Sequence, residues 1–257
     1  MSSSTVNLKQ PNASPGTTKA RGLRRPGFRR TAIGLVVPIL ILLAWQWVGQ
    51  SAAMAGLMPT PVQVARAWYV WMFGNPGLGL NPYQGTWLGN VQYSSLRVLQ
   101  GFLLAMLLGI PLGLSIGWSR LMSHMFDPLI QGLRPIPITA WLPFSIALFG
   151  IRDMGAIFLI FLGGFYAIVV NTTQGARDVD RNLVRAAQMM GAKPAHMLRR
   201  VVLPAAMPSI FTGLRIGLGI SWTAVIVSEM VASKSGLGYV MWDASYVGRI
   251  AIVHADM

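Results

Sequence analysis

Long apolar runs that carry few charges constrain this chain more than any other feature of its sequence. Of its 257 residues, 53% are apolar and only 11% are charged, whereas soluble domains carry about 25% charged residues. Runs of this kind suit a lipid environment, where backbone groups find no water and must bond to one another within a helix. The sequence therefore predicts an all-α, polytopic membrane helix bundle.

The apolar runs predict about five membrane spans, at residues 33–48, 96–118, about 128–149, 155–170 and 204–227. Between the first two spans, a turn-rich segment with one basic residue indicates an outside loop, with a short surface helix over residues 62–73. Residues 119–127 are expected to form a short loop, and residues 228–249 a second outside segment. A further apolar stretch begins at Ile250, close to the last residue, Met257, so we expect six spans in the intact protein.

Two features qualify this count of spans. The first run follows a basic segment and precedes small residues, as in a cleaved signal peptide, but a retained helix is favoured because the rest of the chain is also membrane-embedded. The third run is interrupted by Arg134-Pro135-Ile136-Pro137. Proline lacks a backbone N–H and breaks a helix, so a broken segment is predicted here, where the backbone is buried in protein or lines a cavity.

Small residues recur at every fourth position of the second span, at Gly101, Ala105, Gly109, Gly113 and Gly117. This spacing places them in one stripe along a helix, where a second helix can approach closely. The stripe predicts a tightly packed helix pair within the bundle.

The basic residues cluster beside the apolar runs. The formal net charge is +14, with seven Lys/Arg in the first thirty residues and six between Arg177 and Arg200. Lys and Arg next to spans mark the cytoplasmic side, so the N-terminus is predicted to be cytoplasmic. A nucleic-acid partner is disfavoured, because no soluble binding fold accompanies the basic residues. We expect a disordered basic tail over residues 1–30 and one transmembrane domain over residues 31–257.

The cytoplasmic segment at about residues 176–203 carries the most specific pattern. It contains Arg185-Ala186-Ala187, then Gly191, and later Leu203-Pro204. Two short helices are predicted around Gly191, which ends the first and allows a sharp turn. Pro204 is expected to start the next span, where a missing N–H costs little. The alternative, a basic amphipathic helix resting on anionic lipid, does not require the Gly and Leu-Pro spacing.

This pattern resembles the cytoplasmic loop of the permease subunits of ABC importers. Ala186, Ala187, Gly191, Leu203 and Pro204 match the family positions, whereas Arg185 stands where the family has an acid. Three further stretches, Arg97–Gly117, Asp127–Pro137 and Gly213–Met230, are similar to the nitrate/sulfonate/taurine branch of this family.

The resemblance implies a type I ABC importer permease that moves a small anion such as nitrate, taurine or an alkanesulfonate by alternating access. It implies a bacterial inner-membrane protein and a homodimer surrounded by membrane lipid. Two cytoplasmic ABC ATPase subunits and a periplasmic substrate-binding protein are the implied partners. The residues expected to couple the permease to the ATPase are Arg185, Ala186, Ala187, Gly191, Leu203 and Pro204.

Catalytic motifs are absent from the sequence, which agrees with a transport subunit rather than an enzyme. There is no GxxxxGK[ST] phosphate loop, no HExxH pair and no cysteine, so this chain lacks the usual residues for ATP hydrolysis or a zinc site. We expect no cofactor or metal on this chain, with ATP and magnesium bound by the partner ATPase.

Three ionisable residues within or at the ends of the spans suggest a translocation pathway or gate, since such groups at membrane depth are usually functional. Arg134 lies at the proline break, Arg215 inside the fifth span and Glu229 at its outer end. Either arginine could lend positive potential to an anion pathway, and Glu229 could hold a gate. Structural roles are the alternative, through snorkelling or a pair with Glu229.

Two other classes of protein compete with this interpretation. An ion-driven secondary transporter usually has internal repeats and buried coupling acids, but no repeat is visible and Glu229 is the sole glutamate. A membrane-anchored scaffold does not require the Ala-Ala-Gly-Leu-Pro spacing.

Overall fold

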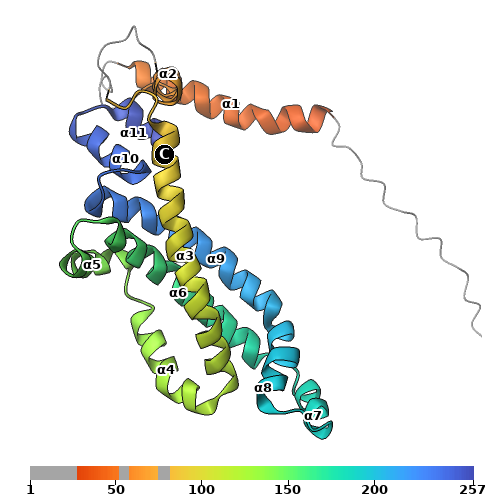
Figure 1. Ribbon diagram of the computed structural model, residues 1–257. Helices are drawn as coiled ribbons and strands as arrows, with labels where there is room; N and C mark the ends of the chain where they lie inside the picture. The colour runs from red at the N-terminus through yellow and green to blue at the C-terminus, as the bar shows by residue number, and fades with distance from the viewer. Residues whose placement is uncertain (1–27, 52–57, 75–81) are drawn as a thin grey trace, which may run out of the picture.

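The computed structural model describes residues 28–51, 58–74 and 82–257, with side chains from residue 36 onward (Figure 1). In these ranges all regular structure is helical, as predicted. Residues 1–27, most of the predicted basic tail, lie outside the described residues. The helices are α1 (Phe28–Gln50), α2 (Pro61–Phe73), α3 (Trp87–Trp118), α4 (Arg120–Leu133), η1 (Ile138–Trp141), α5 (Leu142–Phe149), α6 (Asp153–Arg177), α7 (Arg181–Met189), α8 (Pro194–Met197), η2 (Leu198–Val202), α9 (Leu203–Ala232), α10 (Leu237–Tyr246) and α11 (Ile250–Asp256).

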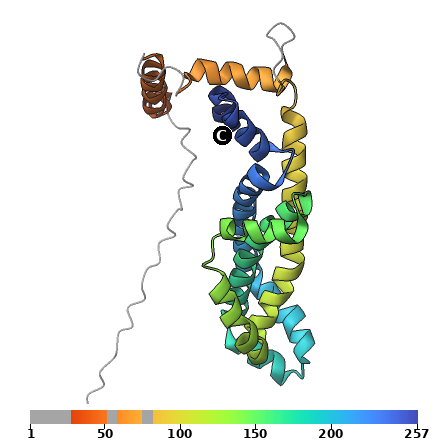
Figure 2. The ribbon, with the colours of Figure 1, turned by 90° about the vertical axis from the view of Figure 1, so that its left-hand side faces the viewer.

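Three long helices, α3, α6 and α9, run along the molecule and pack together as its core (Figures 1 and 2). Helices α2, α10 and α11 gather at one end, which we call the α2 end. Helices α7 and α8 lie at the opposite end, which we call the α7 end (Figure 1). Helix α1 projects sideways from the α2 end, away from the three long helices (Figures 1 and 2).

The stripe of small residues does bring α3 close to a second helix, which is α6. A Cβ atom added at Gly113 would lie 2.7 Å from Cβ of Thr172, and one added at Gly117 would lie 2.5 Å from Cβ of Ala176. Helix α6 also packs closely against α9 through a glycine, because a Cβ atom added at Gly175 would lie 2.5 Å from Cβ of Ser209 in α9. Glycine and alanine therefore set the spacing of all three core helices.

Three of the predicted spans are confirmed as long apolar helices, although their bounds differ. The helices long and apolar enough to cross a membrane are Trp87–Trp118, Asp153–Arg177 and Pro194–Ala232. Each extends beyond its predicted span, α3 at its N-terminal end and the other two at both ends. The part of α1 with described side chains, Val36–Gln50, is a shorter apolar helix.

The third predicted span is not one straight helix. Helix α4 and the η1–α5 segment are bent by 95° relative to each other and pass as a fourth span only when taken together. The break falls between Leu133 and Ile138, at the predicted Arg-Pro-Ile-Pro sequence. The predicted loop at residues 119–127 is wrong, because α4 already begins at Arg120. Its apolar residues recur with a spacing of four and pack beside Val169 of α6, namely Met122, Phe126 and Ile130.

Pro204 lies in the first turn of α9, as predicted, but α9 is not separated from the segment before it. Residues Pro194–Ala232 form one continuous helix of 39 residues, because the turn η2 is a π-helix in which the Leu203 N–H bonds to the Leu198 carbonyl. The wider turn lies just before Pro204, whose ring would otherwise crowd the carbonyl four residues earlier. The second predicted coupling helix, α8, and the span α9 that follows it therefore form one continuous helix.

Apolar side chains cover much of the outer surface of the long helices. Four leucines of α3 are 40–64% exposed, namely Leu103, Leu104, Leu107 and Leu108. A soluble monomer rarely exposes an apolar face of this size. In a membrane the same face lies against lipid tails or another span.

The small-residue stripe makes a prediction for stability. Gly113→Ala places a methyl group against Thr172 and the Val169 carbonyl, at 2.7 and 2.8 Å, and overpacking of this kind costs about 1–3 kcal/mol. We expect the thermal midpoint of the detergent-purified protein to fall. Gly89→Ala is the control, since the added Cβ has no neighbour within 4 Å in the same helix. Equal midpoints for the two variants would contradict the close α3–α6 contact.

Candidate functional site

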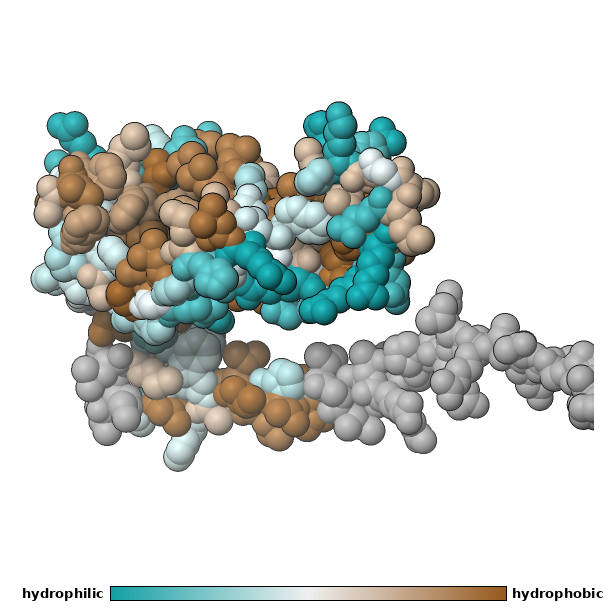
Figure 3. Space-filling view, turned by 90° about the horizontal axis from the view of Figure 1, so that it is seen from below, coloured by the Kyte–Doolittle hydropathy of each residue, from teal (hydrophilic) through white to brown (hydrophobic). Residues whose placement is uncertain are grey.

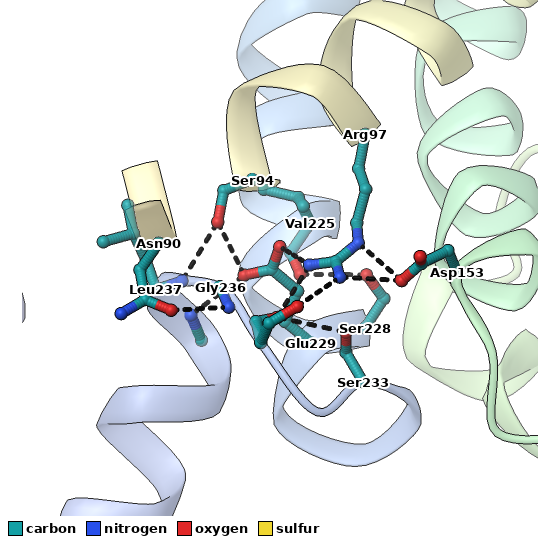
Figure 4. Close-up of polar contacts among 12 residues, drawn as sticks. Asn90, Ser94, Arg97, Asp153, Val225, Ser228, Glu229, Ser233, Gly236 and Leu237 are labelled. Atoms are coloured by element: carbon teal, nitrogen blue, oxygen red, sulfur yellow. Dashed lines mark hydrogen bonds and ion pairs between the residues drawn. The ribbon is translucent and has the colours of Figure 1, made fainter. Parts of the chain in front are cut away.

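A buried arginine, Arg97 of α3, is the centre of a polar network at the α2 end of the core (Figure 4). Its residue is only 4% exposed. All five N–H groups of the guanidinium have acceptors. Nη1 donates to Oε1 of Glu229 at 2.6 Å and to the Ser235 carbonyl at 2.7 Å. Nη2 and Nε donate to Oδ1 of Asp153 at 2.7 and 3.0 Å, and Nη2 also donates to Oγ of Ser235 at 2.9 Å.

The Glu229 carboxylate of α9 is fully buried and takes part in two further hydrogen bonds. Its Oε2 accepts from Oγ of Ser94 at 2.8 Å and from the N–H of Gly238 at 3.1 Å. Glu229 lies in the last turn of α9, which ends at Ala232, so it stands at the end of this helix as predicted, three residues before the last one. The network therefore joins α3 to α9 inside the bundle.

A glycine turn before α10 lies directly over this carboxylate (Figure 4). The Gly236 N–H donates to Oδ1 of Asn90 and the Leu237 N–H to Oγ of Ser94, both at 3.0 Å. Gly236 has φ of 113°, and a Cβ atom there would collide with the Glu229 carboxyl group. The first N–H groups of α10 thus have side-chain acceptors, and the positive end of the helix faces the negative carboxylate.

Arg97 pairs with two carboxylates that differ in their exposure to solvent. The Glu229 side chain is 0% exposed, whereas the Asp153 side chain is 67% exposed. Arg97 therefore connects a buried acid with an acid at the surface, where Asp153 is the first residue of α6. An unpaired ion at this depth is costly, so neither Arg97 nor Glu229 is stable here without the other.

A second contact holds α10 at the same end of the molecule. Tyr83 is buried and its hydroxyl donates to Oδ2 of Asp243 in α10 at 2.6 Å. Burial and this hydrogen bond raise the pKa of Tyr83 above its ordinary value. The segment before α3 is therefore tied to α10 independently of Arg97.

The predicted coupling residues form a helix–turn–helix at the α7 end. Helix α7 closes with a pair of bonds from Gly191 N–H to the Gln188 carbonyl and from Ala192 N–H to the Ala187 carbonyl. This is the Schellman arrangement, which places a residue with positive φ after the helix, and Gly191 has φ of 76°. Ala187 is buried, whereas Met189 and Met190 at the tip are 90% and 82% exposed. The unit presents an apolar tip on a polar helix, a shape suited to insertion into a groove on another protein.

The structure does not bring the three predicted pathway residues together. Arg134, at the break after α4, and Arg215, midway along α9, are both exposed. Among the described residues neither makes an ion pair, and Glu229 pairs with Arg97 instead. The alternative that Arg134 or Arg215 pairs with Glu229 is therefore wrong.

Sequence reasoning missed Arg97 as the partner of Glu229, together with Asn90, Ser94 and Asp153. A usable signal was present, because a single glutamate inside an apolar helix needs a buried cation, and Arg97 lies in another such helix. The sequence separation of 132 residues and the presence of Arg134 and Arg215 left that choice open.

Comparison with known proteins places this architecture in a transport family. Residues 109–253 match the family described as "Binding-protein-dependent transport system inner membrane component". A putative aliphatic sulfonates transport permease protein of Bacillus subtilis is 34% identical, over 95% of this chain and 86% of that protein. A nitrate import permease protein of Synechocystis is 37% identical, over 85% of this chain and 78% of that protein. A bicarbonate transport system permease protein of Synechococcus elongatus is 34% identical, over 91% and 88% respectively.

The chain therefore belongs to the family of binding-protein-dependent transport inner-membrane components, the permease subunits of ABC transporters. Among solved structures, the MetNI methionine ABC transporter in an inward-facing conformation gives a TM-score of 0.57 at 18% identity, covering 65% of this chain and 85% of that chain. The fold is thus that of a type I ABC importer permease. It is a multi-pass inner-membrane transport component that works with ATPase and substrate-binding partners, and it is not an enzyme.

The buried ion pair makes a prediction for stability. Glu229→Gln leaves Arg97 without its buried counter-charge, and breaking one partner of a buried pair costs about 3–5 kcal/mol. We expect a large fall in the thermal midpoint of the purified protein. Asp153→Asn is the matched control, because that side chain is 67% exposed and exposed pairs contribute about 1 kcal/mol or less.

Comparing the double variant Arg97→Met/Glu229→Met with the single variants Arg97→Met and Glu229→Met measures how strongly the two residues stabilise each other. The double variant removes both charges, so its loss of stability is expected to be smaller than the sum of the two single losses. Strictly additive losses would show that Arg97 and Glu229 do not stabilise each other.

Proposed function

We propose that this chain forms the translocation pathway of an ATP-driven importer for a small anion, as one half of a homodimer that works by alternating access. The observation that carries the proposal is the α7–Gly191–α8 unit, whose second helix runs without interruption into α9. A push on this unit moves a core helix as a rigid body.

In the proposed orientation the N-terminus and the α7 end are cytoplasmic. The basic tail of residues 1–30 and the coupling loop at about residues 176–203 lie on that side, while the α2 end faces the binding protein. The distribution of Lys and Arg supports this orientation. The ATPase subunits dock at Arg185, Ala186, Ala187 and Gly191, and Leu203 and Pro204 carry the motion into α9. ATP and magnesium bind to those subunits, and this chain holds no cofactor or metal.

The pathway lies between two copies of the permease. One copy alone exposes apolar side chains on the same helix as Arg215, among them Phe211, Leu218 and Trp222, which supports a partner surface there. In the dimer, Arg134 and Arg215 lend positive potential to the space between the copies. The protein is surrounded elsewhere by membrane lipid.

Glu229 contributes to the outer gate through Arg97. The network ties α3, α6, α9 and α10 at the α2 end, so opening toward the binding protein requires these elements to move together or to exchange hydrogen-bond partners. Lys234 is exposed in the turn beside the network and lines clefts of about 490 and 410 Å³, with Asp243 in the first and Arg152 and Asp153 in the second.

The names of the related permeases support a small anion as the substrate. Aliphatic sulfonates, nitrate and bicarbonate all carry a small, oxygen-rich anionic group. Nitrate, taurine and alkanesulfonates therefore form the first group of candidates, and bicarbonate joins them. A guanidinium or ammonium group suits each of these anions.

Co-purification of the ATPase tests the proposed coupling site. The tagged protein is co-expressed with the products of its neighbouring genes, and the chains retained in mild detergent are identified by mass spectrometry. A stoichiometric ABC ATPase is expected with the unmodified chain. Gly191→Val is expected to lose most of it, because a β-branched residue is strained at φ of 76°.

Gly248→Val is the matched control, since Gly248 has φ of 70° but lies in a turn after α10. It carries the same backbone strain and is expected to retain the ATPase. If the unmodified chain retains no ATPase, and anion uptake in vesicles responds to ionophores rather than to ATP, a secondary transporter replaces the importer.

Anion uptake tests the pathway residue Arg134. In vesicles containing the ATPase and the binding protein, Arg134→Gln is expected to slow uptake by roughly tenfold, the effect of losing about 1.4 kcal/mol of favourable potential. Bound ATPase is expected to stay unchanged. Arg66→Gln, which removes an exposed charge on α2, is the control. Unchanged uptake by Arg134→Gln would remove this residue from the pathway.

A further inference from the structure

A cleft of about 640 Å³ lies at the α7 end, between the ends of the long helices and the coupling helix. Its walls come from the end of α3, the start of α4, the end of α6 and one side of α7. The lining residues that matter here are Trp118, Arg120, Arg177, Arg181, Arg185 and Gln188. Seen from this end, hydrophilic residues form a band across the face (Figure 3).

Positive charge in this cleft is not balanced by the protein. Four arginines line it and no carboxylate does. Arg177 pairs with Asp127 at 2.6 Å, but Arg120, Arg181 and Arg185 form no ion pair among the residues that the structure describes. Arg181 and Arg185 are also four residues apart on one helix, a spacing at which like charges repel.

The nearest acids in the chain are engaged elsewhere. Oδ1 of Asp178 accepts a hydrogen bond from Nε2 of Gln174 at 2.9 Å. Asp180 caps α7, with its Oδ1 accepting from the Asn182 N–H at 2.8 Å. The cleft therefore offers exposed guanidinium groups to an anionic ligand, and guanidinium groups match the geometry of a phosphate group.

The position of the cleft favours a lipid headgroup over a soluble ion as the source of that phosphate. Trp118 is the last residue of the apolar helix α3, and tryptophan at the end of a span lies at the level of the lipid headgroups. The cleft runs along one side of α7, from Arg181 to Gln188, whereas the exposed residues Met189 and Met190 lie at the far end of that helix. That end is thus available to the ATPase while the side that lines the cleft lies beside lipid.

We propose that this cleft binds the phosphate of an anionic phospholipid headgroup, held by Arg120 and Arg181 beside Trp118. Basic pockets between spans on the cytoplasmic side recognise such headgroups. The bound phosphate relieves the repulsion along α7 and fixes this side of the coupling helix against α3 and α4. The assignment rests on the proposed function in one respect, that the α7 end is cytoplasmic.

Lipid retention measured on the full-length permease tests the site. The protein is reconstituted in nanodiscs of phosphatidylcholine with phosphatidylglycerol, extracted, and examined by native mass spectrometry. The unmodified chain is expected to retain phosphatidylglycerol. Arg120→Gln/Arg181→Gln is expected to reduce retention by roughly thirtyfold, from two lost charges at headgroup level. Both residues are exposed, and a single symmetrical gel-filtration peak checks that the variant folds.

The matched control is Arg199→Gln/Arg200→Gln, which removes two exposed charges at the same end without altering the lining of the cleft. It is expected to retain phosphatidylglycerol like the unmodified chain. Equal retention by the two double variants would overturn the proposal.

Two further outcomes would also overturn it. If inorganic phosphate binds equally well in discs of phosphatidylcholine alone, and phosphatidylglycerol adds nothing, the cleft serves a soluble anion. If Arg120→Gln/Arg181→Gln keeps its lipid but loses the co-purifying ATPase, the arginines serve that protein instead. Because retention is read on the permease alone, failure of the coupling proposal leaves this result unaffected.

Discussion

One guanidinium group, that of Arg97, connects the three helices on which the rest of the structure is built. It starts on α3, reaches Glu229 of α9 at 2.6 Å and Asp153 of α6 at 2.7 Å. In a membrane interior a charged group without a partner is expensive. Each of these helices therefore constrains the others, and the turn that carries Gly236 and Gly238 is held over the buried carboxylate by the same contacts.

The close packing along the rest of the core complements this network. Contacts through glycine and alanine let helices approach closely, but such contacts are similar from one turn to the next and do not fix the axial position strongly. The Arg97–Glu229 pair does fix it, because a shift of α3 against α9 by one turn, about 5.4 Å, would break the bonds of Arg97 and Ser94 to the Glu229 carboxylate. Glycine spacing supplies the contact area, and the ion pair supplies the register.

The sequence allowed prediction of features that depend on local chemistry. The stripe from Gly101 to Gly117, the break at Pro135 and Pro137, the surface helix α2 and the turn at Gly191 each follow from spacing or from the properties of glycine and proline. Features that depend on distant residues were missed. Arg97 and Glu229 are 132 positions apart, and only the folded chain places them together.

Two local features of the structure differ from the prediction. The loop predicted over residues 119–127 is the first part of α4, and the spacing of Met122, Phe126 and Ile130 fits a helix with one buried face. The π-turn before Pro204 has no comparable signal. A proline at that position fits either a helix start or a widened turn inside a helix. In the folded chain Val202 and Ala206, on either side of Pro204, are buried in one cluster with Leu114 and Ala176 of the neighbouring helices, so tertiary packing decides between them.

The continuity of α8, η2 and α9 gives the two ends of the molecule a mechanical connection. Leu203 lies near the α7 end, and Glu229 lies in the Arg97 network at the α2 end, 26 residues further along the same helix. At 1.5 Å per residue the two positions are about 39 Å apart. A break at Pro204, as the sequence suggested, would have let the coupling helices move without α9. In the proposed alternating-access cycle, rotation at the α7 end is carried along this continuous helix to Glu229. The Arg97 contacts hold the α2 end to the same helix, so under this proposal the buried ion pair and the predicted coupling loop move together.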